Sequence, residues 1–133
     1  PVLLRLKSDL VSHCMAALNN SLNREKVEWE TRKSLGVVMA SGGYPGNYSN
    51  NHPILGLEDI SSKYGHKVFH GGTKFADNRL VTNGGRVLCV TALGDSLEDA
   101  KTSAYELVSK ISWENVQYRT DIGWRAIEKN RKI

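Results

Sequence analysis

At 133 residues, the chain has the length of one compact domain and is too short for two ordinary ones. Hydrophobic residues make up 40% and charged residues 24%, which excludes collagen-like, coiled-coil and disordered proteins. The net charge of +4 is spread along the chain, and even the basic stretch 125–132 includes Glu128, so we expect no nucleic-acid partner. No window approaches the roughly 20 apolar residues of a membrane helix, so we expect no membrane partner.

The first predicted element is an amphipathic helix that ends near residues 19–21. Ser8 or Asp9 can cap its N-terminus. Four residues share one helical face and form its apolar side: Leu10, Cys14, Ala17 and Leu18. A polar connection follows, in which Val27 and Trp29 alternate with glutamates, and this alternation predicts a short strand.

A buried strand is predicted next, over 35–40, because this short run is apolar and rich in β-branched residues. The segment 41–53 contains too many glycines, prolines and asparagines for regular structure, so it predicts a long loop. Long ordered loops of compact domains often carry function. Residues 54–62 fit either one helical turn or an extended segment, and 67–70 predict another strand that ends at the glycine pair 71–72.

Two further strands are predicted over 79–82 and 86–93. Asn83, Gly84 and Gly85 lie between them, and an Asn-Gly turn with positive φ angles is typical of a hairpin. We therefore expect these two strands to pair with each other in antiparallel fashion.

A second amphipathic helix is predicted from Leu97 to Ile111. Ser96 can cap it, and Glu98 and Asp99 suit the positive end of its dipole. A final short helix is expected over 122–129. Because the strands cluster between helices and strand–helix alternation is not sustained, the predicted fold class is α+β, with a small, mostly antiparallel sheet and flanking helices.

The cysteines and histidines do not indicate a metal site. Cys14 and Cys89 each lie in an apolar segment, which predicts buried thiols in a reducing, cytoplasmic compartment. The four histidines have no mutual spacing typical of metal ligands. Adjacent residues on a helix diverge by about 100°, so His13 and Cys14 make a poor chelate.

Three segments can hold an anion. Arg5, Lys7 and Ser8 stand before a helix N-terminus, where cations and free N–H groups can act together. The segments 42–46 and 82–86 offer backbone N–H groups, and Arg86 adds a cation. Each segment also has a purely structural interpretation: a solvated helix start for the first and tight turns for the other two.

Taken together, five motifs resemble phosphoribosylamine–glycine ligase, the glycinamide ribonucleotide synthetase of purine biosynthesis. They lie at 5–10, 37–46 (with Ser-Gly-Gly-Tyr-Pro-Gly), 68–73 (Val-Phe-His-Gly-Gly-Thr), 81–88 (Val-Thr-Asn-Gly-Gly-Arg-Val-Leu) and 118–123. Their order and spacing match over essentially the whole chain, in the manner of a bacterial-type member. The match is to the C-terminal part of that family of ATP-grasp enzymes.

The resemblance implies a carbon–nitrogen ligase. In that family ATP phosphorylates the glycine carboxylate, and the amine of 5-phosphoribosylamine attacks the glycyl phosphate to give glycinamide ribonucleotide. ATP and Mg²⁺ are the implied cofactors, with ligands largely in the N-terminal domains of the same polypeptide. The resemblance also implies that 1–33 end the ATP-grasp domain and that 34–133 form the C-terminal α+β domain.

No catalytic or metal-binding residue is assigned within this chain, which we expect to be inactive by itself. The resemblance and the local chemistry together imply substrate-binding residues in all three anion-compatible segments. Arg5, Lys7 and Ser8 are expected near the acyl phosphate. Two loops are expected to face the ribose phosphate: Gly42, Gly43, Tyr44, Pro45 and Gly46, and Thr82, Asn83, Gly84, Gly85 and Arg86. The alternative function is a free-standing module that binds a phosphorylated metabolite without catalysis.

Overall fold

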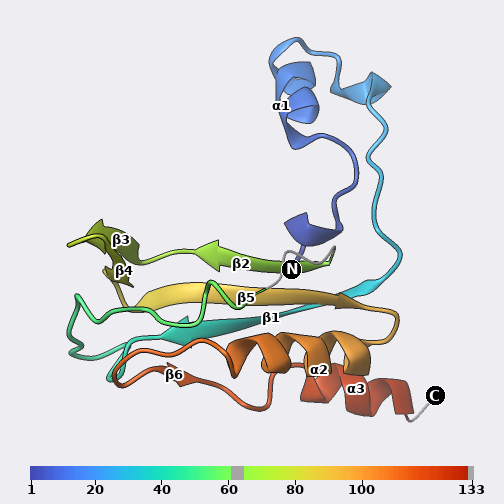
Figure 1. The fold of residues 1–133 in the computed structure, drawn as a ribbon. Coiled ribbons are helices and arrows are strands. Elements are labelled where there is room, and N and C mark those ends of the chain that lie inside the picture. The colour runs from blue at the N-terminus through green and yellow to red at the C-terminus, as the bar shows by residue number, and fades with distance from the viewer. Residues whose placement is uncertain (61–64, 132–133) are drawn as a thin grey trace.

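The computed structural model describes residues 1–60 and 65–131, and it has two visibly different parts (Figure 1). A body of sheet and helices holds nearly all of the core, and an N-terminal arm rises away from it. The predicted α+β class with a mostly antiparallel sheet is confirmed.

The body is built on a four-stranded antiparallel sheet in the order β2-β5-β1-β6. Its strands are β1 (Lys33–Ala40), β2 (His66–His70), β5 (Arg86–Gly94) and the short β6 (Gln117–Tyr118). β1 and β2 confirm the strands predicted at 35–40 and 67–70, whereas β6 was not predicted. A separate two-stranded sheet pairs β3 (Thr73–Ala76) with β4 (Arg79–Thr82).

The core lies between one face of the sheet and α2 (Leu97–Val108). Alternate residues of β1, including Val37 and Met39, are fully buried, as are Ala100 and Ala104 of the helix. The predicted cap of α2 is confirmed: Ser96 Oγ accepts from the Asp99 N–H, and the Asp99 carboxylate accepts from the Ser96 N–H. α3 (Trp124–Arg131) packs beside α2 and begins two residues later than predicted.

The predicted pairing of 79–82 with 86–93 is wrong. β4 instead pairs with β3, and the turn between them is Asp77–Asn78, both with positive φ. Asn83, Gly84 and Gly85 are not in that conformation, and they connect two different sheets. The Asn83-Gly84 pair therefore does not form a hairpin turn. Asp and Asn also tolerate positive φ angles, and Asp77–Asn78 forms the hairpin turn instead.

The segment that precedes the second sheet is extended. Ile54 N–H donates to the Leu80 carbonyl, and Leu55 pairs with Ser112 in an isolated bridge. The extended alternative therefore holds at the start of 54–62, with a turn bonded from Ile60 N–H to the Leu57 carbonyl further on. The end of that range, residues 61 and 62, lies outside the described residues.

The arm consists of η1 (Leu3–Arg5), α1 (Leu10–Leu18) and η2 (Leu22–Arg24). Asp9 is the cap of α1, as one of the two sequence alternatives held. The predicted apolar face is not buried, since Leu18 is 76% exposed and only Ala16 of the helix is buried. Instead of the predicted strand at 27–30, there is one isolated bridge between Leu6 and Trp29.

Candidate functional site

The structure brings two of the three predicted segments together at one end of the sheet. β1 leads into the loop 41–53, which we call the glycine-rich loop, and β5 begins at Arg86 beside it. Ser41 N–H donates to the Gly85 carbonyl, and Ser41 Oγ donates to the Gly84 carbonyl, both at 2.8 Å. A Cβ at Gly85 would overlap the ring of Tyr44, so glycine is required for this close approach.

The remaining glycines of the loop allow close packing within the loop and against the segment after α2. Gly43 has a φ of +94°, and a side chain there would overlap the Asn47 carbonyl. Gly42 lies against the Asn115 carbonyl in the same way, and Gly46 N–H donates to the Gly43 carbonyl at 2.7 Å. The tight-turn interpretation therefore accounts for Gly43. Pro45 follows Tyr44 through a cis peptide bond.

Thr82 and Asn83 anchor backbone. Thr82 is fully buried, and its Oγ1 accepts from the His52 N–H at 3.2 Å. Asn83 N–H donates to the Gly72 carbonyl at 2.8 Å. These contacts hold the turn 82–86 against the neighbouring segments. Arg86 is the cationic residue of this turn.

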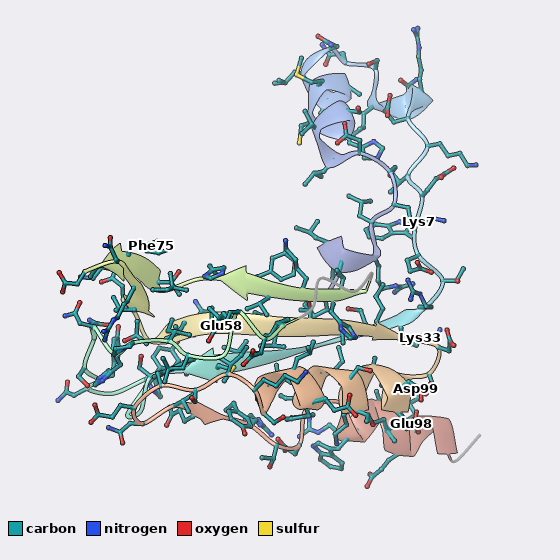
Figure 2. All side chains as sticks on the ribbon, in the orientation of Figure 1. Lys7, Lys33, Glu58, Phe75, Glu98 and Asp99 are labelled. Atoms are coloured by element: carbon teal, nitrogen blue, oxygen red, sulfur yellow. The ribbon has the colours of Figure 1, made fainter. Side chains whose placement is uncertain are left out.

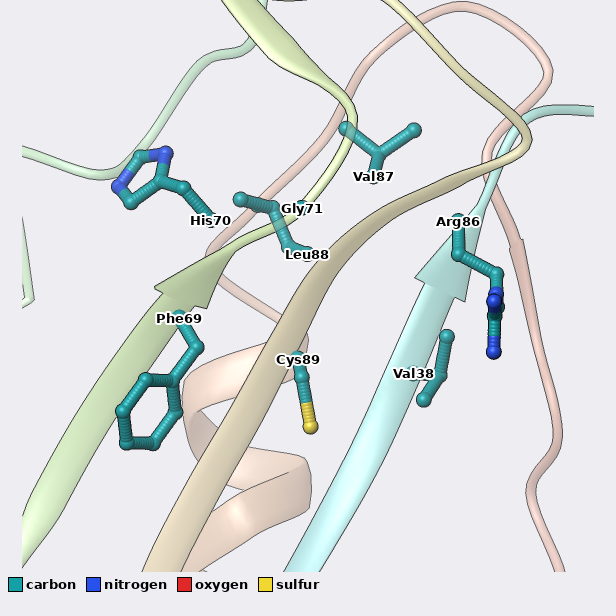
Figure 3. Close-up of a pocket in the computed structure, with 8 residues that line it drawn as sticks. All are labelled: Val38, Phe69, His70, Gly71, Arg86, Val87, Leu88 and Cys89. Atoms are coloured by element: carbon teal, nitrogen blue, oxygen red, sulfur yellow. The ribbon is translucent and has the colours of Figure 1, made fainter.

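Arg86 stands at the rim of a pocket of about 400 Å³ on the sheet face opposite α2 (Figure 3). Val38, Cys89 and Phe69 form its floor, in one cross-strand row over β1, β5 and β2. The Arg86 guanidinium makes no hydrogen bond or ion pair with any described residue. The pocket therefore offers an apolar floor and a cation that is free to bind an anion.

His70 also lines this pocket, but its imidazole points away from Phe69 and Arg86 (Figure 3). Its Nδ1 lies 3.2 Å from Thr73 Oγ1. The ring therefore belongs to the connection with β3 rather than to the anion-binding rim.

A second pocket, of about 460 Å³, flanks Val38 on the other side. Tyr44 and Gln117 line it, and Gln117 Nε2 donates to the Tyr44 carbonyl at 2.7 Å. Arg119 lines it as well but is paired with Asp121, through bonds of 2.8 and 2.5 Å. These bonds raise the pKa of Arg119 and lower that of Asp121, so Arg119 is the less available cation.

The third predicted segment lies elsewhere. Figure 2 shows Lys7 toward the Lys33 end of the sheet, while the glycine-rich loop follows the opposite end of β1. The Arg5 guanidinium donates to the Glu30 carbonyl at 2.9 and 3.2 Å. Ser8 Oγ lies 2.7 Å from His13 Nε2, and it accepts from the Glu28 N–H. Of the three predicted residues, Lys7 has the free cationic group within the described part of the chain.

The floor of the first pocket was missed from the sequence. Val38 and Cys89 lie in apolar strands that were read only as buried, although Val38 is 44% exposed. Period-two alternation puts Val38 on the face opposite Val37, and this signal could have found it. Burial raises the pKa of the Cys89 thiol, which suits an unreactive packing residue. The prediction that Cys14 is buried is wrong, because this residue lies on the exposed side of α1.

The described residues offer neither a metal centre nor a membrane-spanning helix. Within 1–60 and 65–131, no group of three or more His, Cys, Asp or Glu side chains is arranged to hold a metal ion. No helix in the same ranges has the length and apolar character needed to cross a bilayer.

Comparison with known proteins gives a family match over most of the chain. A family model described as phosphoribosylglycinamide synthetase, C domain, matches residues 34–125. A phosphoribosylamine–glycine ligase of Escherichia coli K12 is 53% identical over 132 residues, and one from Vibrio parahaemolyticus is 46% identical over 132 residues. These alignments cover 98% and 99% of this chain but 30% of each relative, so the chain spans about a third of their length.

A solved structure agrees with these sequence matches. The crystal structure of phosphoribosylamine–glycine ligase from Thermotoga maritima superimposes with a TM-score of 0.65 at 32% identity. The superposition covers 81% of this chain and 27% of that one. The α+β arrangement therefore has a counterpart within a longer protein.

Proposed function

Because this chain belongs to the phosphoribosylglycinamide synthetase C-domain family, we propose that it forms part of a phosphoribosylamine–glycine ligase of purine biosynthesis. The intact ligase joins glycine to 5-phosphoribosylamine with ATP and Mg²⁺, giving glycinamide ribonucleotide, ADP and phosphate. We place it in the cytoplasm, where two unpaired cysteines suit the reducing conditions.

The chain's own part in this reaction is substrate binding. The described residues do not fit a magnesium site, since they contain no suitable cluster of ligands, and we derive no step through magnesium or ATP. The remaining N-terminal domains of the polypeptide are the proposed source of those ligands. The isolated chain is accordingly expected to be inactive.

Arg86 is the proposed phosphate ligand. A ribose phosphate carries a dianion, and a guanidinium can bind two of its oxygens in one plane. Arg86 has no competing partner among the described residues and projects beside the glycine-rich loop, where Tyr44 packs on Gly85. The apolar floor with Val38 and Cys89 lies next to it and limits the water that competes for the same oxygens.

Lys7 is assigned to a different part of the ligase. Lys7 lies toward the Lys33 end of β1 (Figure 2), whereas Arg86 pairs with Ala40 at the other end of that strand, so both cannot bind one small phosphate group. We propose that Lys7, supported by Arg5 and Ser8, faces the acyl phosphate in the intact protein. Residues 1–33 would then end the ATP-grasp domain, and 34–133 would form the C-terminal domain.

One observation carries the proposal: 53% identity with a phosphoribosylamine–glycine ligase over 98% of the chain. The test is an assay of the intact polypeptide that contains this sequence, with ATP, glycine and phosphoribosylamine. Formation of glycinamide ribonucleotide that depends on all three is the expected result. If the intact protein binds a phosphorylated sugar but makes no product, the binding-module alternative replaces the ligase. Product formation by the 133-residue chain alone would refute its assignment as an inactive part.

A further inference from the structure

His52 lies where three segments around the candidate site meet. Its Nε2 is 2.6 Å from Ser49 Oγ in the glycine-rich loop, and its Nδ1 is 3.1 Å from the Glu114 carboxylate, in the segment after α2. Its backbone N–H donates to Thr82 Oγ1, and its carbonyl accepts from the Thr82 N–H at 3.0 Å. His52, near the end of the glycine-rich loop, thus bonds within that loop and links it to the end of β4 and to the segment 113–117.

The row Ser49–His52–Glu114 has the order of groups in a Ser–His–acid nucleophile relay. Its surroundings do not support that chemistry, because Ser49 lines neither pocket of the candidate site. The Glu114 side chain is 71% exposed, whereas the His52 side chain is 17% exposed. The arrangement is suited to holding three segments together.

The same loop is tied to the same segment a second time, close to the pocket. Gln117 donates to the Tyr44 carbonyl at 2.7 Å, and Gly42 lies tightly against Asn115. The loop therefore has one side-chain tie near Tyr44 and another at His52. Between the two, the rings of Tyr44 and Tyr48 are in contact, with centroids 6.1 Å apart.

We propose that His52 is a positioning residue for the phosphoribosyl site. Its imidazole holds Ser49 and Glu114, so the glycine-rich loop keeps Tyr44 on Gly85, beside Arg86, before a ligand arrives. A loop that is already ordered avoids the entropy cost that binding would otherwise meet. The identity of the ligand rests on the proposed function, but the ordering of the loop does not.

The first test is kinetic and uses the intact ligase. His52→Ala is expected to raise KM for phosphoribosylamine by about 3–10-fold, with kcat within about twofold and KM for ATP and glycine unchanged. Glu114→Gln should give a smaller rise in the same KM, because an amide oxygen still accepts from the imidazole. Glu106→Gln is the matched control, since Glu106 is an exposed glutamate of α2 whose carboxylate has no partner among the described residues.

A second measurement, amide hydrogen exchange of the same intact polypeptide, tests the positioning role of His52 even if no ligase activity is found. Amide hydrogen exchange over 43–50 should be about tenfold faster or more in His52→Ala, with β1 and β5 still protected. Unchanged exchange in the loop would refute the positioning role, as would faster exchange with an unchanged KM for phosphoribosylamine. Equal rises in the KM of all three substrates would also refute it. An inactive wild-type ligase would refute the proposed function, while the exchange data would still decide the role of His52.

Discussion

The body and the arm of this chain show what an amphipathic pattern needs in order to be buried. α2 packs against β1 and β5, and its apolar side forms the core together with these two strands. α1 has a comparable predicted face, yet on that face Leu10 is 48% and Leu18 76% exposed. Among the residues whose burial the structure describes, every buried hydrophobic residue except Ala16 lies between 35 and 127. The body therefore carries the stability of the described structure, and the apolar side of α1 stays exposed.

The two methionines give the largest predicted contrast between these parts. Met39 is fully buried in β1, whereas Met15 on α1 is 52% exposed. Met39→Ala should lower the free energy of unfolding by about 2–5 kcal/mol, because it leaves a cavity in the core. Met15→Ala should change it by less than about 0.5 kcal/mol. Urea unfolding of both variants measures the difference, and equal losses would mean that the arm shares the core's stability.

A smaller effect is expected at Tyr105, which ties α2 to the chain that leads into α3. Its hydroxyl donates to the Arg119 carbonyl at 2.6 Å and accepts from the Ile122 N–H at 3.2 Å. Tyr105→Phe should cost about 1 kcal/mol of unfolding free energy. Tyr118→Phe is the control, because the Tyr118 hydroxyl has no hydrogen bond within the described residues. Urea unfolding of the two variants measures this difference. Equal unfolding midpoints would show that the Tyr105 hydrogen bonds contribute nothing to the free energy of unfolding.

The smallest predicted effect is the pH dependence of the cap of α2. Hydrogen bonds from the side chain and backbone of Ser96 lower the pKa of Asp99 below 3.8, its ordinary value. Its contribution to stability is therefore complete above pH 3.8 and lost as pH falls through the lower folded-state pKa. The difference in the free energy of urea unfolding between wild type and Asp99→Asn should therefore become smaller as pH falls from 3.8 through the lowered pKa. A gap that stays constant would exclude the carboxylate as its source.

The same pKa argument separates the two helices. Hydrogen bonds from Ser12 and Val11 lower the pKa of Asp9 at the start of α1. Protonation of the Asp9 carboxylate should destabilise α1 without changing the urea-unfolding midpoint of the body, because α1 contributes little to the core. Amide exchange of α1 as pH falls through the lowered pKa measures this, with β5 as the internal reference.

The sequence predicted correctly those elements that depend on residues close together in the chain. The cap at Ser96 joins residues three positions apart, and the β-branched run around Val37 and Val38 favours extended backbone by its own side chains. The pairing of β4 depended on a competition between two turns, and Asp77–Asn78 supplied the positive φ angles. The two residues of β6 pair with Met39 and Ala40, and so short a strand has no period of its own.

The site was predictable only in part, for a related reason. Arg86 and the glycine-rich loop could be singled out by their chemistry and by their resemblance to a known family. The row of Val38, Cys89 and Phe69 depends on the register of three strands, which is set by non-local pairing. His52 was missed because its partners, Ser49 and Glu114, come together only in the folded chain.

The central claim is that Arg86 binds the phosphate of phosphoribosylamine, and the most direct measurement compares two arginine variants of the intact ligase. Arg24, in η2, is the matched control, because its guanidinium also has no partner among the described residues but lies in the arm. Arg86→Ala should lower kcat/KM for phosphoribosylamine by about 10–100-fold, the scale of a lost charged hydrogen bond, while Arg24→Ala leaves it unchanged. An Arg86→Ala ligase with the kcat/KM of Arg24→Ala would contradict the claim.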